Sequence, residues 1–125
     1  MGTEHIQKFS RWQSCGQPEF GSVRDPIECE ALFEMDGLRH VSAGVKYPAV
    51  MGVAGWNDPR VPAWQPGKFV AALQRASTSG KPVLMMMDYD DGHYTEDKAV
   101  RFRNYAGQYA FLLWQTGHQD FQPVK

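Results

Sequence analysis

The chain has 125 residues, about the size of one small domain, so two independent folds are not expected. Its 13 Lys and Arg residues balance 14 Asp and Glu residues, and the net charge of −1 argues against binding nucleic acid or anionic lipid by bulk charge. Apolar runs are far shorter than the roughly 18–20 residues that cross a bilayer, so we expect no membrane partner. The start has no signal peptide, and Cys15 and Cys29 lack metal-site spacing, so we expect free thiols and a cytoplasmic location.

The first predicted element is a helix. Asp25 is its expected N-cap, and Pro26 suits the first helical position because a proline loses no hydrogen bond there. Glu28 stands three residues after the cap, where it would complete a capping box. Gly37 is the expected end. The inner face is expected to carry Leu32 and Met35.

Two continuous apolar runs, Tyr47–Gly55 and Val83–Met87, predict strands that are buried on both faces. Between them, Trp64–Ala76 carries apolar residues at helical spacing and predicts an amphipathic helix. A final helix is predicted over about Asp97–Gln115. Its apolar stripe is expected to consist of Phe102, Tyr105 or Ala106, Tyr109 and Leu113.

A strand, a crossover helix and a second buried strand form a βαβ unit with parallel strands, so the predicted fold class is α/β. Two parallel strands are too few for an independent sheet, because each leaves an edge that needs another strand. We therefore expect either part of a larger fold or a homo-oligomer that forms through the open sheet edges.

One polar side chain of interest follows each predicted strand. Asp58 comes just after the first strand and His93 shortly after the second. Because the carboxyl ends of neighbouring parallel strands meet at one edge, both side chains are expected at one rim. A carboxylate that accepts from one imidazole nitrogen fixes the tautomer and leaves the other nitrogen to act as a base. Spacing alone also permits ordinary turn chemistry at Asp58 and a simply exposed His93.

The residues around this pair resemble a known family. The matching segments are Tyr47-Pro48-Ala49, Asn57-Asp58-Pro59-Arg60-Val61, Lys68-Phe69-Val70-Ala71-Ala72-Leu73-Gln74, Gly92-His93 and Ala110-Phe111-Leu112-Leu113-Trp114. Together they closely resemble the C-terminal end of the prolyl oligopeptidase family of serine peptidases, and Pro18–Val23 and Met35-Asp36 resemble the segment just upstream. The expected organisation is an irregular lead-in over 1–16, a partial catalytic domain over 17–118 and a tail over 119–125.

The resemblance implies the C-terminal portion of an α/β-hydrolase fold, whose triad runs Ser, Asp, His along the chain. It implies that Asp58 is the triad aspartate and that His93 is the general base. Arg60 matches an arginine that hydrogen-bonds a substrate backbone carbonyl in prolyl-specific members; a solvated or helix-capping arginine is the alternative. Asp91 departs from the pattern, because many members have a small residue before the Gly-His pair.

The nucleophile is missing from this sequence. No serine before Asp58 lies in a G-x-S-x-G elbow; those serines are Ser10, Ser14, Ser22 and Ser42. We therefore expect a fragment that carries the triad Asp and His but is inactive alone, with a peptide substrate only if the missing Ser-bearing part completes it. The alternative is a non-catalytic α/β interaction module that self-associates or docks another chain.

The acidic loop Asp88–Gly92 superficially suits calcium. Its glycine falls at loop position 5 where a calcium loop has it at 6, and Ala99 stands at position 12 where a bidentate Glu is needed. We therefore expect no metal site, and the resemblance implies no cofactor.

Overall fold

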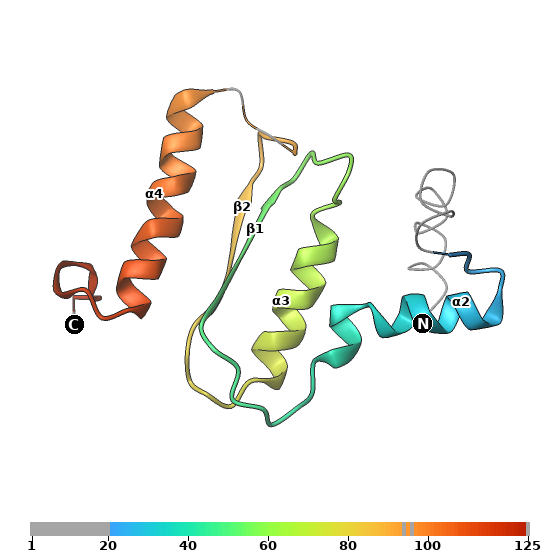
Figure 1. The fold of residues 1–125 in the computed structure, drawn as a ribbon. Helices are drawn as coiled ribbons and strands as arrows, with labels where there is room; N and C mark the ends of the chain where they lie inside the picture. Colours follow the sequence, from blue (N-terminus) through green and yellow to red (C-terminus); the bar gives the residue numbers. More distant parts are fainter. Residues whose placement is uncertain (1–20, 94, 96, 125) are drawn as a thin grey trace. The chain divides into compact units, whose positions relative to one another are not determined.

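The structure is a computed structural model of the chain (Figure 1). The residues that it describes are 21–93, 95 and 97–124. The expected lead-in over 1–16, together with Cys15, lies outside the described residues. The chain divides into two compact units, residues 1–41 and residues 42–125, and each is described by itself.

The first unit contains the helix α2 (Pro26–Glu34) and the 3₁₀ helix η1 (Gly37–His40). Asp25 caps α2 as predicted, because its side chain accepts hydrogen bonds from two backbone amides in the first turn. The predicted capping box is not formed. The Glu28 carboxylate instead accepts from the backbone N–H of Ser22 at 2.7 Å, which ties the preceding loop to the helix.

The end of α2 differs from the prediction. Met35 is the C-cap, and Gly37 begins η1 where it was expected to follow the helix. The reason is local, because the Asp36 side chain accepts from the N–H of Leu38 at 3.0 Å and starts a new turn. Met35 is 64% exposed, so its predicted place on an inner face is wrong, whereas Leu32 is half-buried.

The second unit contains the predicted βαβ arrangement. Its elements in chain order are β1 (Val50–Gly55), α3 (Trp64–Ala76), β2 (Val83–Asp88), α4 (Lys98–Gln115) and the 3₁₀ helix η2 (Gln119–Phe121). The predicted bounds of α3 are confirmed, and β1 begins later than predicted. Pro48 has no N–H to donate to the ladder, and the first ladder donor is Val50, which bonds to the carbonyl of Pro82 at 3.0 Å.

The strands β1 and β2 pair in parallel, with Val50 opposite Val83 and Gly55 opposite Asp88. The parallel pairing confirms the predicted α/β class. Figure 1 shows α3 on one side of the two strands and α4 on the other. Because both strands run the same way, the loops that follow Gly55 and Asp88 leave the sheet at the same edge.

The helix α3 packs closely on one face of the sheet. Its residues Val70 and Leu73 are each 3% exposed. Gly52 permits this approach, since a Cβ at that position would lie 2.6 Å from Cγ2 of Val70 and 3.0 Å from the sulfur of Met85. The side-chain amide of Gln74 adds a hydrogen bond of 2.8 Å to the carbonyl of Val83. These contacts form the core of the unit.

The opposite face of the sheet is only partly covered. Met86 lies against α4 at Gly107, where an added Cβ would be 3.1 Å from the Met86 sulfur. On the same face Val53 is 46% exposed and Leu84 is 38% exposed. The prediction that both strands are buried on both faces is therefore wrong for this face.

The predicted apolar stripe of α4 is also exposed, except at Leu113, which is half-buried. Phe102 is 68% exposed, Tyr105 is 49% exposed and Tyr109 is 63% exposed, whereas Phe111 is buried. The side of α4 that meets the sheet carries Asn104, which bonds to Asp88, and Gly107, which lies against Met86. With 3.6 residues per turn, Phe102 and Tyr109 therefore face away from the strands. None of the helices described here has the length and apolar character to cross a membrane.

Candidate active site

The loops that follow β1 and β2 run side by side beyond the sheet. The N–H of Trp56 donates to the carbonyl of Asp88 at 2.6 Å, and the N–H of Asn57 donates to the carbonyl of Asp91 at 3.1 Å. Contacts between the two chain segments thereby continue past the last ladder pair. The residues that come next in each loop are held at one rim as a result.

Gly55 allows the two loops to approach so closely. A Cβ on Gly55 would lie 2.7 Å from the carbonyl oxygen of Asp91 and would collide with the carbonyl oxygen of Gly92. Both obstacles are backbone atoms, which move only if the whole loop moves. The absence of a side chain at Gly55 therefore sets the distance between the loops.

Asp58 and His93 meet at this rim. The Nδ1 atom of His93 lies 2.8 Å from Oδ2 of Asp58. The Asp58 side chain is 9% exposed and the His93 side chain is 30% exposed, so the carboxylate is enclosed while the ring remains accessible. The prediction that these two side chains come together at the carboxyl ends of neighbouring strands is confirmed.

The second oxygen of Asp58 is held by its own turn. Oδ1 accepts from the backbone N–H of Arg60 at 2.7 Å and from that of Val61 at 2.9 Å. The two interpretations that the sequence left open, turn chemistry and a partner for His93, thus apply to different oxygens of one carboxylate. The turn fixes the orientation in which the other oxygen faces the imidazole.

The protonation state of the pair follows from these contacts. Burial by itself raises the pKa of Asp58, but the amide of Val61, the hydrogen bond to His93 and the amide of Arg60 together bring this pKa below its ordinary value of 3.8. Asp58 is therefore an ionised acceptor at neutral pH, and Nδ1 of His93 must be the donor. In the neutral ring this tautomer places the basic lone pair on Nε2.

Arg60 lies at the same rim. Its backbone N–H takes part in the Asp58 turn, and the residue is exposed. The turn thus fixes the backbone position from which the guanidinium extends. An exposed guanidinium two residues from Asp58 is suited to donate to an oxygen acceptor that reaches the rim.

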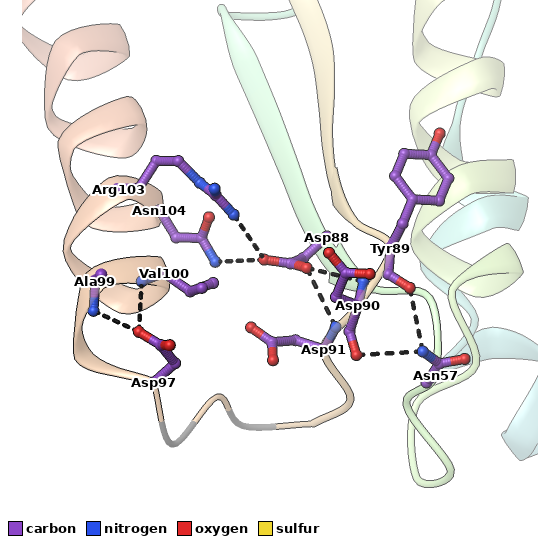
Figure 2. Close-up of polar contacts among 10 residues, drawn as sticks. All are labelled: Asn57, Asp88, Tyr89, Asp90, Asp91, Asp97, Ala99, Val100, Arg103 and Asn104. Atoms are coloured by element: carbon purple, nitrogen blue, oxygen red, sulfur yellow. Dashed lines mark hydrogen bonds and ion pairs between the residues drawn. The ribbon is translucent and has the colours of Figure 1, made fainter.

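A second organised carboxylate ends β2 (Figure 2). Oδ1 of Asp88 accepts from the amides of Asp90 at 3.1 Å and Asp91 at 3.2 Å, and Oδ2 accepts from the Asn104 side chain at 3.0 Å. Arg103 lies 3.9 Å from the same Oδ2. The Asn104 hydrogen bond is the main cause that lowers the pKa of Asp88; burial opposes it, and the two amides and Arg103 add to it. This carboxylate shapes the loop that leads to the histidine.

Asn57 is one of two residues at the site whose roles the sequence did not predict. Its Nδ2 donates to the carbonyl of Tyr89 at 3.1 Å and to that of Asp90 at 3.3 Å (Figure 2). The sequence signal was its place beside Asp58 in the Asn-Asp-Pro motif. Asp88 was also missed as an organising group, because its partner Asn104 lies 16 residues further along, on a helix, and forms no local motif with it.

Hydrogen bonds of the Asp88 side chain organise the acidic loop Asp88–Gly92. Within the part of the chain that the structure describes, no group of three or more His, Cys, Asp or Glu side chains is arranged to hold a metal ion. The Asp88 carboxylate is used instead for the hydrogen bonds to the loop and to α4. Cys29 is a half-buried free thiol.

Curated proteins of similar sequence are peptidases. The chain is 38% identical over 74 residues to dipeptidyl aminopeptidase BI of Pseudoxanthomonas mexicana, and the match covers 57% of this chain and 10% of that protein. It is 35% identical over 81 residues to protease 2 of Moraxella lacunata, covering 62% of this chain and 11% of that protein. The matched region is thus about a tenth of the length of these relatives.

Solved structures of similar fold are also peptidases. Oligopeptidase B from Leishmania major matches with a TM-score of 0.72 and 27% identity, covering 80% of this chain and 14% of that chain. One of two prolyl endopeptidases analysed for inter-domain dynamics matches with a TM-score of 0.69 and 27% identity, covering 80% of this chain and 15% of that chain. The βαβ unit is therefore a partial α/β-hydrolase unit.

The match to a family model extends over nearly the whole sequence. The model of the prolyl oligopeptidase family matches residues 3–119, which include Asp58, Arg60 and His93. Sequence relatives, structural neighbours and family model agree. The chain belongs to the prolyl oligopeptidase family of serine peptidases.

Proposed function

We propose that this chain supplies the Asp and His of a serine-peptidase active site and is inactive without a nucleophile from elsewhere. The observation that carries the proposal is the 2.8 Å contact between Nδ1 of His93 and Oδ2 of Asp58. It is supported by the anchoring of the other carboxylate oxygen on two backbone amides. An ionised, oriented carboxylate beside a partly exposed imidazole is the arrangement that general-base catalysis requires.

Each group has a defined role in the proposed chemistry. The serine oxygen attacks the carbonyl carbon of a peptide bond while Nε2 of His93 takes the proton from the serine hydroxyl. The same proton then passes to the amine that leaves when the C–N bond breaks. Asp58 keeps Nδ1 protonated and stabilises the imidazolium that forms between these two steps.

Arg60 is the proposed substrate-binding residue. It is exposed, its backbone is fixed by the Asp58 turn, and it lies at the same rim as the catalytic pair. A guanidinium at this place would donate to a backbone carbonyl oxygen of the bound peptide. The substrate class in this proposal is therefore a peptide.

The serine must come from another polypeptide segment. This sequence contains no G-x-S-x-G motif, and its matches to the curated relatives cover 10% and 11% of their length. Without a serine hydroxyl, His93 has no nucleophile to activate by removing its proton. Activity is thus proposed only for the assembled, serine-bearing protein.

Two measurements test this function. The purified chain should neither react with a fluorophosphonate probe nor cleave a proline-containing chromogenic peptide above background. Stoichiometric labelling of any serine would contradict the proposed inactivity. For the pair itself, proton NMR should show a strongly downfield His93 Hδ1 resonance that disappears in Asp58→Ala; a parent spectrum without this resonance would contradict the proposed pair.

A non-catalytic interaction module is the second candidate. The observation that favours it is the face of the sheet opposite α3, where Val53 and Leu84 are 46% and 38% exposed. Apolar side chains on an open sheet face favour association with another chain. The simplest such partner is a second copy of the chain, and the oligomeric state in solution tests this.

A further inference from the structure

The geometry points to Asn57 as the positioning residue that holds the His93 loop against the Asp58 loop. The inference rests on the proposed function, because it assigns a role relative to the catalytic pair. Asn57 directly precedes Asp58 in the chain, and its side chain donates to carbonyl groups of Tyr89 and Asp90 in the other loop.

The contacts between the loops form a continuous series. After the last ladder pair come the bond from Trp56 to Asp88, the bonds from Asn57 and finally the pair of Asp58 with His93. The other hydrogen bonds that join these loops before the catalytic pair are made by backbone N–H groups, and the side-chain amide of Asn57 adds two more. The structure thus contains a link between the loops that a side-chain substitution can remove.

The chemistry requires a carboxamide at this position. Nδ2 carries two hydrogens, and the two carbonyl acceptors lie 3.1 Å and 3.3 Å away, so one short side chain serves both. An aspartate has the same shape but offers only acceptor oxygens when ionised, which would repel the carbonyl oxygens of Tyr89 and Asp90. The isosteric Asn57→Asp change therefore removes the link without altering the volume.

The link acts on the loop just before the histidine. Tyr89 and Asp90 lie between the end of β2 and Gly92-His93, and the backbone N–H of Asn57 also bonds to Asp91. Without the side-chain bonds, the loop is fixed at fewer points, and the imidazole samples positions beyond hydrogen-bond reach of Asp58. Asn57 does not contact substrate in this proposal and acts through His93 alone.

The experiment compares Asn57→Ala and Asn57→Asp with Gln74→Ala. Gln74 is the matched control, because its side-chain amide also donates to a backbone carbonyl, that of Val83, at the opposite end of β2. The readout is the His93 Hδ1 resonance, with Asp58→Ala as the reference for a broken pair. We expect both Asn57 variants to lose the resonance or to exchange its proton at least about tenfold faster, while Gln74→Ala retains it.

The outcomes separate this proposal from the proposed function. A resonance that persists unchanged in both folded Asn57 variants overturns the positioning role and leaves the catalytic pair standing. A parent chain without the resonance overturns the pair itself. If Asn57→Ala fails to fold, Asn57→Asp decides by itself, since it keeps the side-chain volume but has no donor when ionised. It should fold and lose the resonance or exchange its proton faster, and an unchanged resonance overturns the proposal.

Discussion

Asp58 and His93 are 35 residues apart in the chain, yet Oδ2 of the carboxylate lies 2.8 Å from Nδ1 of the ring. The separation is bridged by α3 and β2, which return the chain to the edge where β1 ends. The pair therefore depends on the parallel register of two strands and on the contacts between the loops that follow them.

The first prediction concerns acid stability. Because the pKa of Asp58 is lowered on folding, its ionised form contributes stability that is fully present above the unfolded value near 3.8 and is lost as pH falls through the lower folded value. Denaturant unfolding should show the free energy of unfolding falling with pH below about 4. In Asp58→Asn the free energy of unfolding should fall less steeply with pH, since the asparagine amide does not titrate.

Asp88→Asn provides the comparison for this acid titration. The pKa of Asp88 is lowered as well. Replacing its carboxylate should therefore also reduce the fall in the free energy of unfolding at acid pH. A double variant with the same pH dependence as the parent would contradict both assignments.

Gly55 is predicted to tolerate no side chain. In Gly55→Ala the new Cβ meets backbone oxygens of the second loop, so we expect a loss of roughly 1–3 kcal/mol in the free energy of unfolding and a displaced His93. Gly67→Ala is the matched control. A Cβ at Gly67 in α3 meets nothing within 4 Å, and alanine should stabilise the helix by about 0.5–1 kcal/mol. Equal effects of the two changes would refute the argument.

The bond between Asn104 and Asp88 is predicted to tether α4 to the end of β2. Asn104→Ala removes a 3.0 Å hydrogen bond and should lower the free energy of unfolding by about 0.5–1.5 kcal/mol. Arg103→Ala should cost less than about 0.5 kcal/mol, because its contact is 3.9 Å long and its side chain is 70% exposed. Chemical denaturation measures the loss in both variants. A larger loss in Arg103→Ala than in Asn104→Ala would show that the ion pair is the tether.

The chain is predicted to self-associate through the exposed apolar face of its sheet, which carries Val53 and Leu84. Sedimentation equilibrium should give a mass above the 14.2 kDa of one copy, and Leu84→Lys or Val53→Lys should lower that mass. Ile27→Lys is the control, since Ile27 is 82% exposed but belongs to α2 in the other unit. A single 14.2 kDa species with cooperative thermal unfolding would count against association and against the interaction module.

Local sequence signals accounted for most of the element boundaries. The helical spacing over Trp64–Ala76 corresponds to α3, and Asp97 caps α4 through bonds to two amides, because periodicity and caps act within one or two turns. The end of the first helix was predicted less well. There Asp36 starts a new turn, a competition between neighbouring side chains that composition does not resolve.

Burial was the property that the sequence predicted worst. The aromatic residues of α4 have the spacing of an inner stripe, but Tyr109 is 63% exposed. Apolar spacing indicates that a face is suited to burial, and whether it is buried depends on what lies beside it. In this structure α4 meets the sheet through Asn104 and Gly107, so Tyr109, two residues beyond Gly107, faces away from the strands.

By itself, the sequence determined the α/β class, the family resemblance and the pairing of Asp58 with His93, because strand order and parallel direction bring both loops to one edge. The tertiary structure decided how that pair is held. The amide bonds to Oδ1 of Asp58 and the reach of Asn57 across to Tyr89 and Asp90 require the two loops at their final separation. Gly55 sets that separation because its missing side chain leaves room for the backbone of Asp91 and Gly92. This close approach exists only once the two strands are paired in register.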